Sequence, residues 1–371
     1  MQPTVMKKAS GLDVLAVVPY QLGFQPKQSI VVIALKPPRS RLGMMSRLDL
    51  ATTRQPGAGH AVARQLLQYL KADGANGAFV IRYASPADGP AEQDRAMRSV
   101  VEVFERSLDK VVSWDVVAPK VIPLQPGTLQ AMAHSYTTED LASTQMAATM
   151  IAQGATYLPE RADLALLPDI SQAQVRQASR SQRRVLDKAQ MLTGSQLADW
   201  RLEELARWRR WLDLLAEAGD AVDQVEVPAC ELGHLGALLQ EMPGRDAVLV
   251  LILDEAPGAE LAAIRGGFDD RVFDQLATPG HQPSDRYLLA APRLLALVAA
   301  HQVKRRRGGT LALMAWFAWW HSDGARAEVL ADAALALPEP PSLAHLIKDL
   351  VQCSALPGAL RLRAGQNGGS S

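Results

Sequence analysis

Residues 11–50 constrain the fold more than any other part of the chain. They contain a short apolar segment at 13–18, which predicts a helix that Pro19 ends, and a continuous β-branched run, SIVVIAL, at 29–35. A run of that kind predicts a strand that is covered on both faces. Pro37 and Pro38 end the run, and a second extended segment follows at 43–50. We expect the two segments to form a hairpin.

Strands and amphipathic helices continue to alternate along the first third of the chain. The segments 78–83 (AFVIRY) and 111–117 (VVSWDVV) are typical of strands, whereas 61–72 and 90–108 have the apolar period of helices. A helix that follows a strand implies a crossover connection and some parallel pairing. The sequence therefore predicts an α/β unit, a mixed sheet with flanking helices, over residues 1–137.

Apolar segments of helical length replace the strands in the rest of the chain. Long stretches with apolar stripes at helical spacing fill 171–218 and 287–351. The run DAVLVLIL at 246–253 fits either a strand or a buried helix by period alone, and its helical neighbours favour a helix. We predict a larger, mainly helical unit over 138–364 and a disordered tail over 365–371, which has nothing to bury.

Charge and cysteine content limit the class of protein. The 371 residues include 39 basic and 39 acidic side chains, so any preference for nucleic acid, membranes or acidic ligands must be local. Cys230 and Cys353 lie far apart, which argues against a disulfide framework and for a reduced, cytoplasmic setting. The apolar run 311–320 has about half the roughly 20 residues of a membrane span. We therefore expect a soluble, cytoplasmic protein with no membrane segment.

The spaced residues of the opening stretch resemble the signature of a known family. They are Asp13-Val14-Leu15, Val18-Pro19-Tyr20, Leu22-Gly23-Phe24, Pro26, Ser29-Ile30-Val31-Val32 and Arg47-Leu48-Asp49. Together they resemble the opening of an actinobacterial family, also found in actinophages, known as domain of unknown function 4192. A weaker similarity continues at 147–164, 245–246 and 315–324. The resemblance implies a fold and a host range, and it supplies no reaction.

Three residues near the predicted strand ends are candidates for a ligand site. Ser29, Arg47 and Asp49 stand where α/β sheets commonly bind ligands. Arg47 and Asp49 share one face of their strand, so they could offer a donor fork and an acceptor. In the alternative interpretation, Arg47 and Asp49 form a structural ion pair and Ser29 merely begins a strand, which is the commoner case.

Motifs for catalysis or metal binding are weak. Gly57-Ala58-Gly59 opens a helix but lacks the third glycine of a phosphate-binding turn, so a flexible loop is the better interpretation. Cys230 and His234 are four residues apart, and no two further ligands are apparent for a tetrahedral site. The sequence therefore predicts no catalytic residue, no metal site and no cofactor.

Two basic segments stand out in the helical part. Arg176, Arg180, Arg183, Arg184 and Lys188 recur at helical spacing, so one helix face could meet phosphates or an acidic protein. Solvated helix faces often look the same. The basic run 304–307, followed by aromatic residues at 316–320, fits a helix end and a buried helix better than an interfacial membrane anchor. The segment 313–337 also resembles a single tetratricopeptide-type hairpin.

Three functional hypotheses follow. The first is a non-catalytic cytoplasmic protein that binds an unidentified protein partner or small ligand, with the helical unit as the contact surface. The second is an enzyme that acts on a small polar substrate at the sheet edge, through Ser29, Arg47 and Asp49. The third is association with nucleic acid through the basic helix face.

Overall fold

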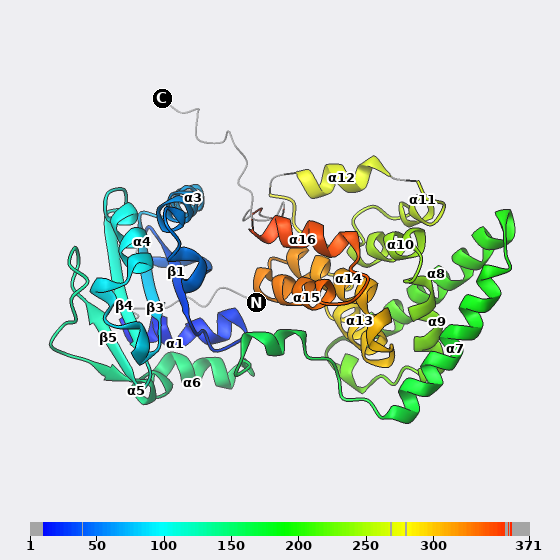
Figure 1. The fold of residues 1–371 in the computed structure, drawn as a ribbon, viewed down its shortest axis with the longest axis horizontal. Helices are drawn as coiled ribbons and strands as arrows, with labels where there is room; N and C mark the ends of the chain where they lie inside the picture. Colours follow the sequence, from blue (N-terminus) through cyan, green and yellow to red (C-terminus); the bar gives the residue numbers. More distant parts are fainter. Residues whose placement is uncertain are drawn as a thin grey trace. The chain divides into compact units, whose positions relative to one another are not determined.

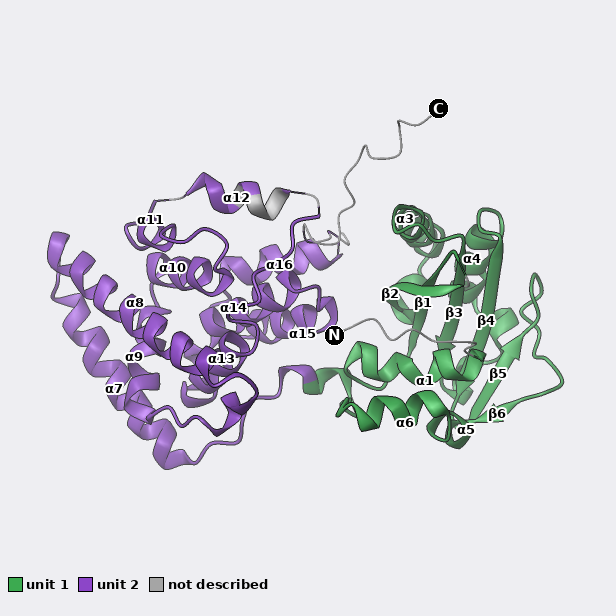
Figure 2. Cartoon of the chain, turned by 180° about the vertical axis from the view of Figure 1, so that it is seen from behind, with its two compact units in different colours: residues 1–163 green, residues 164–371 purple. Residues whose placement is uncertain are grey.

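The structure, a computed structural model, describes residues 10–38, 40–267, 269–278, 280–352, 355 and 357, without the side chains of 273 and 275–277. The chain divides into two compact units, Met1–Asp163 and Leu164–Ser371 (Figure 1, Figure 2). The first is an α/β unit and the second is helical, which confirms the predicted fold class. The predicted tail, 365–371, lies outside the described residues.

A six-stranded mixed sheet forms the centre of the α/β unit, with the strand order β2-β1-β3-β4-β5-β6. The strands β3 and β4 are parallel, and all other neighbours in this sheet are antiparallel. The predicted hairpin of β1 and β2 is confirmed, because Ser29 pairs with Asp49. The strands are β1 (Ser29–Lys36), β2 (Arg41–Asp49), β3 (Gly77–Tyr83), β4 (Lys110–Val117), β5 (Lys120–Leu124) and β6 (Tyr136–Thr137).

Helices cover both faces of this sheet. Side chains alternate along a strand, so Ile30 and Val32 pack under α3 (Ala58–Ala72) and α4 (Arg95–Glu105), while Val31 and Ile33 pack under α1 (Gly11–Leu22). The helices α5 (Thr138–Ala142) and α6 (Gln145–Ala152) pack against α1 and belong to the same unit. The short helices α2 (Leu50–Thr53), η1 (Pro86–Asp88) and η2 (Ala91–Gln93) lie in the connections. Coverage on both faces explains why β1 is apolar along its length.

The first helix is longer than predicted. Ser10 caps it in a capping box with Asp13, and Gly23, with φ of 77°, ends it. Pro19 lies inside the helix, although we expected the helix to stop there. A proline in a helix removes one backbone hydrogen bond. Because residues 14–18 are buried, their packing on the sheet face keeps the helix intact through this position.

The helical unit packs its helices around one apolar core. The predicted helix at 246–253 is confirmed as part of α10, and α14 and α15 form the predicted helical hairpin. Among the described residues, no helix is both long and apolar enough to span a membrane. The elements are η3 (Arg161–Ala165), α7 (Gln172–Gln190), α8 (Gly194–Glu217), η4 (Gly219–Gln224), α9 (Ala229–Leu238), α10 (Met242–Leu253), α11 (Glu260–Ile264), α12 (Asp270–Ala277), α13 (Ala290–His301), η5 (Lys304–Arg306), α14 (Gly308–Trp320), α15 (Gly324–Leu335) and α16 (Ser342–Gln352).

Gly233 allows α9 to pack closely on α7. A Cβ at this position would lie 2.4 Å from the carbonyl oxygen of Ala178 and 2.8 Å from Cβ of Ser181. Neither atom can rotate away, so the helices would have to separate. We expect Gly233→Ala to lower the free energy of unfolding of the helical unit by about 1–3 kcal/mol. Urea denaturation followed by tryptophan fluorescence measures this, since all tryptophans except Trp114 belong to the helical unit.

The matched control is Gly324→Ala in the same unit. No heavy atom lies within 4 Å of a Cβ placed on Gly324, which begins α15. Alanine is the better helix former, so this change should leave stability unaltered or raise it slightly. An equal loss of stability in both variants would contradict the close packing of α7 and α9 at Gly233.

Candidate functional site

The three predicted ligand-site residues lie together at one edge of the sheet. Ser29 begins β1, and its neighbours in register are Asp49 on β2 and Tyr83 on β3. Arg47 Nη2 is 3.5 Å from Asp49 Oδ2. Asp49 also accepts the N–H of Ala51 at 2.9 Å and thereby caps α2. The hairpin thus brings Ser29, Arg47 and Asp49 close to one another, and Asp49 has a local structural partner.

The three residues differ in how far solvent can reach them. Ser29 is fully buried, and its Oγ has no hydrogen-bond partner among the described residues. Tyr83 beside it is also buried, and burial raises the pKa of its hydroxyl above the usual range. The guanidinium of Arg47 lies 6.0 Å from the ring centroid of Phe24, and the side chain of Asp49 is 46% exposed. A solute could therefore reach Asp49 from solvent, whereas it would have to open the core to reach Ser29.

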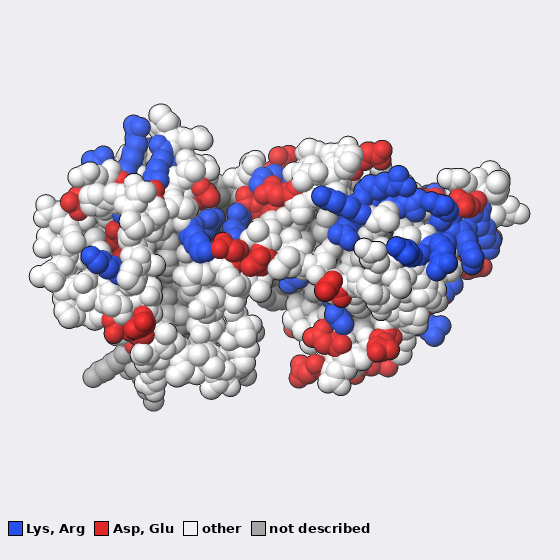
Figure 3. All heavy atoms as spheres, turned by 60° about the horizontal axis from the view of Figure 1, so that its bottom comes forward, with Lys and Arg blue, Asp and Glu red and all other residues white. Residues whose placement is uncertain are grey.

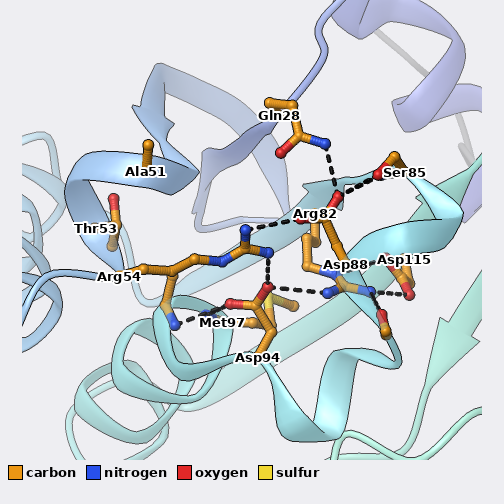
Figure 4. Close-up of polar contacts among 12 residues, drawn as sticks. Gln28, Ala51, Thr53, Arg54, Arg82, Ser85, Asp88, Asp94, Met97 and Asp115 are labelled. Atoms are coloured by element: carbon orange, nitrogen blue, oxygen red, sulfur yellow. Dashed lines mark hydrogen bonds and ion pairs between the residues drawn. The ribbon is translucent and has the colours of Figure 1, made fainter.

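A denser polar cluster, drawn in Figure 4, surrounds Arg82 of β3. Arg82 precedes Tyr83 in this strand, so its side chain lies on the face opposite to that of Tyr83. Arg82 donates from Nε and Nη2 to the two carboxylate oxygens of Asp115, both at 2.8 Å, and from Nη1 to Asp94 at 3.0 Å. Arg54 pairs with Asp94 and, at 2.8 Å, with Asp88. We call these five residues the Arg82 network. They come from β3, β4, η1 and the residues that follow α2 and precede α4.

The sequence analysis missed the Arg82 network, although it contains a signal. AFVIRY and VVSWDVV each carry one charged residue within an otherwise apolar strand, and the two charges are opposite. The parallel register of β3 and β4 places Arg82 beside Asp115. A buried charge requires a partner. The occurrence of one cation and one anion in neighbouring buried strands could therefore have predicted the pair.

Two carboxylates of the Arg82 network, Asp88 and Asp94, have lowered pKa values. Burial would raise the pKa of Asp94, but hydrogen bonds from Arg54, the Met97 N–H and Arg82 outweigh burial and lower it. Hydrogen bonds from Gln28 and Ser85 lower the pKa of Asp88 strongly. A general acid or base works best when its pKa lies near the working pH. The lowered pKa values of Asp88 and Asp94 instead suit carboxylates that hold this edge together.

A small pocket lies beside the Arg82 network, at the carboxyl ends of β3 and β4. Its volume is about 310 Å³, and Asp115 forms part of its wall. We call it the edge pocket. It is lined by Ser85, Pro86, Gly89, Pro90, Ala91, Glu92, Asp115, Val117, Lys120, Ile122, Leu124 and Ala131. Most of these residues are apolar, and Glu92 and Lys120 add one charge of each sign.

The predicted basic stripe is an exposed face of α7. The five cations, Arg176, Arg180, Arg183, Arg184 and Lys188, all point to solvent, because the helix buries Ala178, Gln182, Val185 and Ala189 on its other side. Lys and Arg side chains gather on the helical unit in Figure 3. The stripe therefore has the amphipathic arrangement that the sequence indicates.

The turn η5 lies against α7 near Arg183, which the sequence analysis did not predict. Arg306 Nη1 donates to Oε1 of Gln182 on α7 at 3.3 Å, although the two residues are 124 positions apart. Lys304 and Arg305 of the same turn are exposed. We call the five cations of α7 together with Lys304, Arg305 and Arg306 the basic face.

The cations of the basic face form no ion pair with a described residue. None of the eight side chains does so, whereas Arg201, Arg207 and Arg209 of α8 each pair with a glutamate. Burial, and then the nearby cations Arg305 and Arg183, lower the pKa of Arg306, against the smaller opposing effect of Asp187 on α7. The face therefore carries a positive potential that favours an external anion.

Cys230 and His234, which lie four residues apart in the sequence, do not share a common partner. His234 Nδ1 lies 3.0 Å from the buried carboxylate of Glu204, and Cys230 is exposed. The described residues hold no group of three His, Cys, Asp or Glu side chains placed to bind a metal ion. His234 is thus part of a contact between α8 and α9.

Comparison with known proteins places the chain in a family. Residues 12–357 match the family model "Domain of unknown function (DUF4192)", from within α1 to beyond α16. A comparison with the curated proteins finds no match, and neither does a comparison with the solved structures. The family match covers both the α/β unit and the helical unit. The chain therefore belongs to the DUF4192 family.

Proposed function

We propose that this DUF4192 protein is a non-catalytic binding protein whose helical unit binds the phosphate backbone of nucleic acid through the basic face. The proposal includes a cytoplasmic location and an actinobacterial or actinophage origin. The widely separated cysteines favour that location, and the residues of the opening signature favour that origin. In this proposal the helical unit contacts the nucleic acid, and the α/β unit does not.

One observation carries the proposal: eight cations lie on α7 and on the turn η5 that packs against it, and none has an ion-pair partner among the described residues. Elsewhere in the same unit, Arg286 pairs with Asp213 and Arg293 with Asp223. The overall charge is balanced at 39 to 39, so this concentration is local. A local excess of positive charge is the electrostatic footprint of a protein that neutralises phosphates.

The spacing of the cations favours a regular polyanion. From Arg176 to Lys188 the row follows α7 for about 18 Å, at roughly 1.5 Å per residue. That length corresponds to roughly five base pairs at about 3.4 Å each. Cations recur at about one per helical turn along this row. A continuous phosphate backbone can meet all of them, whereas a single small anion can meet only one or two.

Salt dependence tests the proposal. A fluorescently labelled 20-base-pair duplex of arbitrary sequence is titrated with the full chain, and anisotropy measures the affinity. A protein that makes roughly 6–10 phosphate contacts loses about 10³–10⁵ in affinity between 50 and 200 mM salt. We expect a loss of at least about a hundredfold, since not all eight cations need contact phosphates at once. Affinity that is absent at 50 mM salt or insensitive to salt would overturn the proposal.

Charge reversal on the basic face provides the second test. The triple variant Arg176→Glu, Arg180→Glu and Arg183→Glu should abolish measurable duplex binding at 50 mM salt. The matched control reverses three exposed arginines of the α/β unit, Arg64, Arg95 and Arg98, which changes the net charge by the same amount. Equal losses in both triple variants would show that only net charge matters. Stronger binding of poly-glutamate than of the duplex would assign the basic face to an acidic protein instead.

A further inference from the structure

The edge pocket lies where this sheet topology commonly binds ligands. The parallel strands β3 and β4 end at Tyr83 and at Val117, respectively. Each has an antiparallel neighbour on its outer side, β1 beside β3 and β5 beside β4. In open α/β sheets, ligands bind outside the carboxyl ends of strands, at points where the strand direction or order changes. The pocket volume of about 310 Å³ is at the lower end of the range for ligand pockets, roughly 300–1,000 Å³. A small metabolite matches this size.

The walls of the pocket suit an apolar group. Pro86 and Pro90 come from the connection between β3 and α4, and Val117, Ile122 and Leu124 come from the hairpin of β4 and β5. Prolines fix the backbone on one side, and paired strands fix it on the other. The pocket is therefore preformed, and it can hold a branched or aromatic side chain without reordering its walls.

Two side chains of opposite charge line the edge pocket and do not form an ion pair with each other. Glu92 of η2 and Lys120 of β5 both belong to the lining. Neither forms an ion pair with the other or with any other residue that the structure describes. Elsewhere at this edge, charged side chains such as Arg54 and Arg82 are paired. The lining thus offers one unused acceptor and one unused donor to a ligand that carries both charges.

Asp115 adds a fixed acceptor to the pocket lining. Its side chain is buried, and each of its carboxylate oxygens accepts one N–H from Arg82 at 2.8 Å. A carboxylate oxygen has two lone pairs, so both atoms keep acceptor capacity after these bonds. Because the Arg82 network holds the carboxylate, its position is set before a ligand arrives.

We propose that the edge pocket binds a small zwitterion with an apolar side chain, such as an apolar α-amino acid. Its ammonium group pairs with Glu92 and hydrogen-bonds toward Asp115, its carboxylate pairs with Lys120, and its side chain contacts the walls formed by Pro90 and Ile122. This site is separate from the basic face, and its occupation does not require nucleic acid. It would make the α/β unit a sensor or carrier of the ligand.

Calorimetric titration of the full chain with L-leucine and L-phenylalanine tests the proposal. Two leucine analogues serve as ligand controls, isoamylamine without the carboxylate and 4-methylvalerate without the ammonium group. We expect saturable binding of at least one amino acid and at least about tenfold weaker binding of both analogues, because each analogue leaves one charge of the pocket unpaired. This comparison uses the unaltered protein, so it does not depend on how a variant folds.

Lys120→Met locates the site, and Lys110→Met is its matched control. Lys110 is an exposed lysine at the start of β4, away from the pocket lining. Lys120→Met should weaken amino-acid binding at least about tenfold and leave isoamylamine unaffected, whereas Lys110→Met should change neither. The absence of saturable binding by either amino acid at 10 mM would overturn the proposal, and so would equal effects of the two lysine variants. If the unaltered chain binds amino acids saturably but does not bind the duplex at 50 mM salt, only the proposed function is refuted.

Discussion

Replacing Arg82 by methionine is expected to lower the free energy of unfolding of the α/β unit by about 3–5 kcal/mol. Arg82 is fully buried and holds Asp115 and Asp94 through three hydrogen bonds. Methionine retains much of the packing but leaves these carboxylates buried with less positive charge around them. Amide hydrogen exchange in β3 and β4, measured by mass spectrometry, gives the opening free energy of this part of the sheet.

The matched control for this prediction is Arg54→Met. Arg54 belongs to the same network, but its side chain is 32% exposed, so water can replace part of its interaction. We expect a clearly smaller loss of stability than for Arg82→Met. Equal protection of β3 and β4 in both variants would show that the buried guanidinium is no more important than the exposed one.

Acid unfolding of the Arg82 variant tests the sign of the electrostatic effect. In the natural protein, the pKa of Asp94 is lowered because its hydrogen bonds outweigh burial. A carboxylate with a lowered pKa contributes stability above its unfolded pKa of about 3.9, and this contribution is lost as the pH falls through the folded value. Without Arg82, the pKa of Asp94 rises. The acid-unfolding midpoint of the α/β unit should therefore move to higher pH, and a shift to lower pH would contradict this account.

Trp208→Ala is expected to destabilise the helical unit by about 3–5 kcal/mol. Trp208 of α8 is fully buried, and its Nε1 donates to the carbonyl oxygen of Leu235 on α9 at 3.1 Å. Alanine leaves a cavity and an unsatisfied carbonyl between the two helices. The urea midpoint of the far-ultraviolet circular dichroism signal measures the loss.

Leu214→Ala on the same helix is the surface control for Trp208→Ala. Leu214 is 41% exposed, so its truncation removes little buried area. We expect a change within roughly 0.5 kcal/mol. Trp208→Phe should fall between the two, because it keeps a ring in the core but loses the hydrogen bond. Similar midpoints for all three variants would show that α8 and α9 do not depend on this contact.

The sequence predicts best the strands and helices that contain a long, uninterrupted run of apolar residues. The β-branched run 29–35 became β1, and the apolar run 246–253 became part of α10. In contrast, β5 and β6 went unpredicted. β5 has only five residues with Pro123 among them, and β6 has two residues. Their pairing is set by the neighbouring strand β4 rather than by their own sequences.

The candidate sites differ in how far the sequence could predict them. The five cations of α7 follow from helical period alone, because a helix displays residues four apart on one face. The contribution of η5 requires knowledge of how α7 packs, since Arg306 contacts Gln182 across 124 positions. The edge pocket likewise combines the connection before α4 with the hairpin of β4 and β5. Sites made from several distant segments are visible only when the packing is known.

The two outer strands of the sheet have a consequence for self-association. β6 has only two residues, and the pairing of β1 with β2 shifts register between Ile33 and Leu35. Short strands, bulges and charged residues at a sheet edge disfavour the addition of a further strand from another molecule. β2 begins at the exposed Arg41, which adds a charge to this edge. The sheet is thus protected against edge-to-edge polymerisation, and concentrated solutions of the protein should resist amyloid-like growth from this unit.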